Sequence, residues 1–91
     1  MEVTKSRYGL ERTIEKIDST HIRVMGESQF VRQAQSEDGN VNMFDFEGGP
    51  CLSVGGEISY QNLKWVIKGI DPKQSKYEGL AECVLTVEAK Y

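Results

Sequence analysis

The sequence predicts an all-β protein, a small antiparallel barrel or sandwich of about seven short strands. Apolar and polar residues alternate over several short stretches, which is the period of a half-buried strand. Turn-forming residues separate these stretches about every ten residues, as is typical of small antiparallel folds. With 91 residues, the chain is expected to form a single small β-domain over 1–91, with a polar, flexible segment at 1–7.

The first third of the chain predicts a hairpin of residues 11–17 and 20–26. Asp18-Ser19-Thr20 have turn chemistry, and residues 21–25 alternate as a strand. Leu10, Ile14 and Ile17 also follow the spacing of one helix face. A short N-terminal helix over residues 8–17 therefore stays open as the alternative.

The middle of the chain predicts three further strands. A weaker one covers residues 29–35, and Asp38-Gly39 then predict a type I′ turn, because both central residues of that turn need positive φ. In the next strand, residues 40–46, Phe44 and Phe46 are expected on one face, with Val41 and Met43 on the other. Residues 51–54 are a short strand between two Gly-Gly pairs.

The last third contains the clearest strands. Residues 56–60 and 63–70 predict a hairpin around Gln61-Asn62, with Leu63, Trp65 and Ile67 in the core. A polar loop at 71–76 leads to a final strand at 80–89, whose apolar face is continuous. No Lys, Pro or Gly protects this strand as an exposed edge would require, so we expect a homodimer or a higher oligomer.

The composition restricts the class of partner. A net charge of −3 disfavours a non-specific nucleic-acid coat, which needs a basic surface. The charge is uneven, with an acidic centre and a basic segment at 64–76 that could steer a charged partner. No stretch suggests a membrane contact or a leader sequence, so a cytoplasmic protein with free Cys51 and Cys83 is expected.

Neither a metal site nor a catalytic site is predicted. One His and two Cys without close spacing cannot supply four zinc ligands. Asp45 and Glu47 could share a strand face, but no calcium-loop pattern surrounds them. A Cys–His pair would need His21 to meet a thiol through the fold. We therefore expect no catalytic residues, no cofactor and no enzymatic activity.

No motif assigns the chain to a family. The function that we expect is a non-enzymatic binding module that occupies or sequesters a protein or a small charged ligand such as a nucleotide, as an inhibitor or adaptor from a mobile element does. The alternative is a small-barrel nucleic-acid-binding protein that uses residues 60–77. In either case we expect Lys64 and Lys68 to contact the anion and Tyr60 or Tyr77 to stack nearby, with the glycine turns at 48–56 as the next choice.

Overall fold

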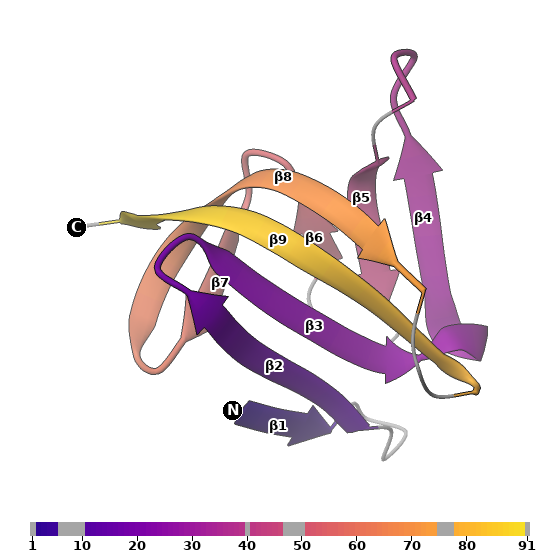
Figure 1. Cartoon of the computed structure of the whole chain (residues 1–91), viewed down its shortest axis with the longest axis horizontal. Helices are drawn as coiled ribbons and strands as arrows, with labels where there is room; N and C mark the ends of the chain where they lie inside the picture. Colours follow the sequence, from indigo (N-terminus) through magenta and orange to yellow (C-terminus); the bar gives the residue numbers. More distant parts are fainter. Residues whose placement is uncertain (1, 6–10, 40, 47–50, 75–77, 91) are drawn as a thin grey trace.

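The structure is a computed structural model that describes residues 2–5, 11–39, 41–46, 51–74 and 78–90. These residues form nine β-strands, one short 3₁₀ turn and no α-helix, so the all-β prediction is confirmed. The elements (Figure 1) are β1 (Glu2–Lys5), β2 (Glu11–Asp18), β3 (His21–Glu27), η1 (Ser28–Phe30), β4 (Val31–Gln35), β5 (Val41–Phe46), β6 (Cys51–Ser53), β7 (Glu57–Tyr60), β8 (Leu63–Lys73) and β9 (Leu80–Lys90).

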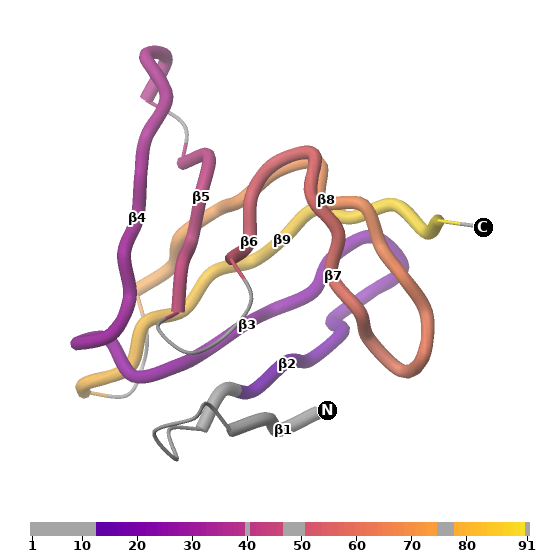
Figure 2. The backbone as a smooth tube through the Cα atoms, turned by 180° about the vertical axis from the view of Figure 1, so that it is seen from behind, coloured from indigo at the N-terminus to yellow at the C-terminus, as the bar shows by residue number. Residues whose placement is uncertain are grey.

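The strands form one bent, open sheet with antiparallel pairing throughout. Its order is β1-β2-β3-β9-β8-β5-β4, with β6 paired to β5 and β7 paired to β8. Among the described residues no pairing joins β1 to β4, so the sheet does not close into a barrel. Figure 2 shows β4 and β5 running across the direction of β3 and β9, so the sheet bends and encloses its core on one side.

The final strand lies in the middle of the sheet and not at its edge. β9 pairs with β3 through Leu80–Thr86 and with β8 through Glu82–Lys90. A strand that is paired on both sides needs no edge protection. The argument for self-association from an unprotected edge strand is therefore wrong, and self-association itself stays a prediction.

The N-terminal hairpin is confirmed. β2 pairs with β3, and the Asp18 carboxylate closes the turn by accepting a hydrogen bond from the Thr20 amide at 2.8 Å. The helical alternative is wrong for residues 11–17, whereas residues 8–10 lie outside the described part of the chain. Glu2–Lys5, which the sequence predicted to be flexible, pair with β2 as strand β1.

The two predicted hairpin turns differ. Gln61 and Asn62 have φ values of 51° and 65°, the two positive angles of a type I′ turn. At the other hairpin Gly39 has a φ of 88° and donates its amide to the Ser36 carbonyl at 3.0 Å, but Asp38 has no positive φ. The type I′ prediction for Asp38-Gly39 is therefore wrong, because Gly39 alone takes the left-handed conformation.

The core is one cluster on the inner face of the bent sheet. Trp65 is 7% exposed, so its predicted burial is confirmed, and the predicted apolar face of β9 also points inward. Leu63 was expected beside Trp65 but is 57% exposed, because it directly follows the turn at the hairpin tip. The buried residues are Ile14, Ile22, Val24, Val41, Phe44, Phe46, Leu52, Ile58, Tyr60, Trp65, Ile67, Ile70, Cys83, Leu85 and Val87.

A β-bulge changes the expected faces of β5. Ala34 pairs with Met43 and Gln35 pairs with Val41, so Asn42 has no opposite residue on β4. The extra residue turns Val41 to the same side as Phe44, and both are buried. The prediction that Val41 faces away from the phenylalanines is wrong for this reason.

Candidate functional site

The three predicted site residues that the structure describes, Tyr60, Lys64 and Lys68, do not form one cluster. Lys64 and Lys68 are both exposed on β8, as the alternation predicted, but Tyr60 is only 4% exposed. Tyr77 lies outside the described residues. The structure therefore places Tyr60 in the core, where its ring is not exposed for stacking, and the stacking role of Tyr77 stays a prediction.

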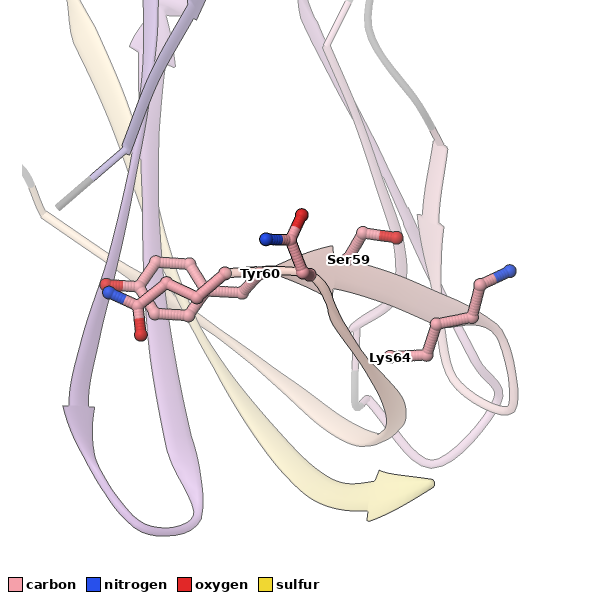
Figure 3. A pocket seen from close by; sticks show the side chains of 5 residues that line it. Ser59, Tyr60 and Lys64 are labelled. Carbon is pink, nitrogen blue, oxygen red and sulfur yellow. The ribbon is translucent and has the colours of Figure 1, made fainter. Parts of the chain in front are cut away.

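The hairpin tip shows how the strand alternation separates these side chains. Figure 3 shows Tyr60 pointing to one side of the hairpin, while Ser59 and Lys64 point to the other. The tip borders a hollow of about 280 Å³ lined by Ser59, Tyr60, Gln61, Asn62 and Lys64. Lys64 is the one charged residue of this lining, so the hollow offers a single cation beside neutral hydrogen-bonding groups.

Lys64 has a second lysine as its neighbour, which the sequence reasoning missed. Lys64 on β8 lies directly opposite Lys90 on β9. Lys90 donates a hydrogen bond to Glu57 at 2.6 Å, whereas Lys64 forms no ion pair within the described ranges. Lys90 and, more weakly, Lys64 hold the pKa of Glu57 below its usual value, first through the Lys90 hydrogen bond and then through charge. Two cations thus share one carboxylate.

This arrangement is unfavourable in the isolated protein. Like charges directly opposite each other on neighbouring strands destabilise a sheet. Among the described residues, the Glu57 carboxylate is the acidic group that these two lysines share. An anion placed over Lys64 would remove that repulsion. The alternation of the last strand places Lys90 on its outward face. Only the pairing of β9 with β8 shows that Lys90 lies beside Lys64.

Lys68 belongs to a different hollow. Its ammonium lies 3.5 Å from the Glu88 carboxylate, and both side chains are largely exposed, so this ion pair is weak. Lys68 also lines a groove of about 320 Å³ between the β4–β5 turn, the start of β5, the β6–β7 turn and β8. The groove is lined by Ser36, Asp38, Val41, Asn42, Val54, Lys68, Gly69 and Ile70.

The glycine turns at 48–56 were the second choice for the anion site. In the part of these turns that the structure describes, the backbone amides are not free to bind an anion. The amides of Val54, Gly55 and Gly56 donate to the carbonyls of Asn42, Ile67 and Ser53 at 2.8–3.0 Å. These amides therefore hold β6 and β7 against the sheet and do not point at a ligand. Gly48 and Gly49 lie outside the described residues.

Of the residues considered for catalysis and metal binding, Cys51 on β6 lies opposite Asp45 on β5, and His21 and Cys83 lie on β3 and β9. Cys51 and Cys83 are both free, and burial raises the pKa of the Cys83 thiol to about 12, so this thiol stays protonated. The Nδ1 atom of His21 lies 2.9 Å from the Asp18 carboxylate in the β2–β3 turn.

The predicted pairing of Asp45 with Glu47 on one strand face lies partly outside the described residues. The Asp45 carboxylate accepts a hydrogen bond from Arg32 at 2.6 Å, and Glu47 lies outside the described residues. Within the described ranges, no group of three or more His, Cys, Asp or Glu is placed to hold a metal ion.

Comparisons with known proteins found no match to a family model, to a curated protein or to a solved structure. In the described part of the chain, no helix has the length and the apolar character that are needed to span a bilayer.

Proposed function

We propose that the protein is a non-catalytic binding module that captures a small anionic ligand, such as a nucleotide, on the surface of β8. The observation that carries this proposal is that each of the two hollows described along this strand is lined by one of the predicted lysines, Lys64 or Lys68. The remaining lining groups are hydroxyls, amides, apolar side chains and the single carboxylate of Asp38. Such a lining fits binding better than chemistry.

Charge on this strand also supports an anionic ligand. Lys64 is not neutralised by an acidic partner of its own, and the Lys68–Glu88 pair is exposed and easily exchanged. An incoming phosphate or carboxylate would form charge-assisted hydrogen bonds, which are stronger than neutral ones. The two free cysteines fit a reducing, cytoplasmic setting for this activity.

Titration calorimetry at low ionic strength tests the proposal directly. The probes are the four ribonucleoside monophosphates and inorganic phosphate, and the test variant is Lys64→Gln/Lys68→Gln. Loss of both charges should weaken binding by at least about tenfold, which corresponds to one charged hydrogen bond of about 1.5 kcal/mol. Lys73→Gln is the matched control, because Lys73 lies on the same strand outside both hollows and pairs with Asp71 at 2.6 Å. Wild-type protein that binds none of these anions contradicts the proposal.

A second candidate is single-stranded nucleic acid, favoured by the Lys64–Lys90 pair. Against it, Tyr60 and Trp65 are buried, so they offer no exposed ring on which bases could stack. The net charge of −3 also disfavours a polyanion. Fluorescence anisotropy with labelled oligonucleotides distinguishes the two candidates, because nucleic-acid binding would be much tighter than mononucleotide binding and would weaken steeply with salt.

A further inference from the structure

Two β-bulges in different strands direct their extra residues into the same groove. On β5, Asn42 has no opposite residue on β4, as described above. On β8, Ile67 pairs with Val87 and Gly69 pairs with Thr86, so Lys68 is the extra residue. Asn42 and Lys68 both line the groove of about 320 Å³, which we call the bulge groove.

The position of the bulges accounts for the groove. Among the described residues, β5 and β8 meet at the pair Val41–Ile70, and the extra residue of each bulge lies within two positions of that pair. A bulge bends its strand and re-aims a side chain, and bulges are frequent beside functional sites. Both bulges bend the sheet at this junction, and the extra residue of each, Asn42 or Lys68, lines the hollow there.

The walls of the bulge groove combine three kinds of chemistry. Lys68 supplies a cation, and the exposed Asn42 supplies an amide that both donates and accepts hydrogen bonds. Val41 and Ile70 are buried below, and Val54 is a large apolar residue that is 47% exposed. A volume of about 320 Å³ is at the lower end of the range for small-molecule sites.

We propose that the bulge groove binds a nucleoside monophosphate. Lys68 binds the phosphate in exchange for Glu88, Val54 and its apolar neighbours contact the flat ring, and Asn42 hydrogen-bonds the polar edge of the ligand. This inference rests on the proposed function and assigns it to one of the two hollows.

The single lysine sets the preferred charge of the ligand. Asp38 on the β4–β5 turn also lines the groove, and its carboxylate accepts the hydroxyl of Ser36. One cation opposed by one carboxylate suits one phosphate better than a chain of three. We therefore expect the monophosphate to bind more tightly than the matching triphosphate.

Calorimetry with AMP, ATP, adenosine and inorganic phosphate, together with mapping by amide chemical shifts, tests the assignment. Lys68→Gln and Asn42→Ala should each weaken AMP binding, the lysine variant by about tenfold or more. Glu88→Gln should tighten it, because it releases Lys68 from its ion pair. Lys73→Gln is the matched control, because Lys73 lies on β8 outside the groove and pairs with Asp71, and it should change the affinity by less than about twofold. Lys64→Gln reports whether the hairpin tip takes part in binding. Asn42→Ser is a second variant in case Asn42→Ala perturbs the fold, which the chemical shifts report.

Each outcome is decisive. AMP binding that is lost in Lys64→Gln but kept in Lys68→Gln would move the site to the hairpin tip, which overturns this inference and leaves the proposed function standing. Tighter binding of ATP than of AMP, or binding of an oligonucleotide in place of AMP, also overturns it. If wild-type protein binds no small anion at all, both proposals fail.

Discussion

A methyl group added at Gly26 should collide with Phe46, and this change tests how the sheet bends around its core. Gly26 lies in β3 between Arg12 on β2 and Ala81 on β9. A Cβ atom at this position would lie 2.5 Å from Cδ1 and 2.6 Å from Cε1 of Phe46 on β5. Its φ is not in the left-handed region, so the need for glycine here is one of space.

The cost follows from these distances. Carbon atoms pack best at about 3.5–4.0 Å, so the new Cβ would be about 1 Å too close to a ring that is itself buried. Overpacking of this kind costs about 1–3 kcal/mol. Alanine also lowers the conformational entropy of the unfolded chain, which stabilises the folded state by about 0.4–1 kcal/mol and offsets part of this cost. We therefore expect Gly26→Ala to lower the free energy of unfolding by about 1–2 kcal/mol, or Tm by about 5–15 °C.

Urea and thermal unfolding followed by circular dichroism measure this effect. Gly69→Ala is the matched control, because its Cβ would meet Thr86 at an ordinary 3.7 Å and should leave stability almost unchanged. Phe46→Leu should remove the collision, so the Gly26→Ala/Phe46→Leu pair should cost less than the sum of the single changes. A Gly26→Ala protein as stable as wild type, or strictly additive single changes, would refute the close approach of β3 and β5.

Two further predictions concern buried groups. Trp65→Ala should destabilise the protein by about 3–5 kcal/mol, as other losses of large core side chains do. Trp65→Phe should cost far less in the same unfolding assay, since the buried indole N–H has no hydrogen-bond partner within the described part of the chain; equal losses in both variants would contradict this explanation. Cys51 should react rapidly with Ellman's reagent in the folded protein, whereas Cys83 should react only after unfolding. Burial raises the pKa of Cys83 from its ordinary value of 9.0 to about 12 in the folded state. The contribution of this thiol to stability should therefore be lost as pH rises from about 9 towards 12 in the wild type but not in Cys83→Ala. Fast labelling of Cys83 in the folded protein would contradict this prediction, because it would show that β9 opens to solvent.

The candidate site was only partly predictable. The outward positions of Lys64 and Lys68 followed from the alternation of β8, which is local information. Their separation into two hollows did not, because the bulge at Lys68 can be seen only when β8 is aligned with β9. The bulge at Asn42 could not be predicted either, because it appears only when β5 is aligned with β4 and the neighbouring residues do not indicate it. Tyr60 was misassigned because its aromatic ring suits a core and a stacking surface equally well.

The sequence by itself determined the strands, most turns and most core positions, because side-chain alternation and turn chemistry act over a few residues. It predicted the hairpins β2–β3 and β7–β8, the burial of Trp65 and the apolar face of β9. Only the tertiary structure decided that β9 lies between β3 and β8, that Lys64 lies opposite Lys90, and that two bulges meet at one groove. These features depend on which distant strands pair and in which register. That choice is made by the fit of whole strand faces around the core, and no short stretch of the chain contains it.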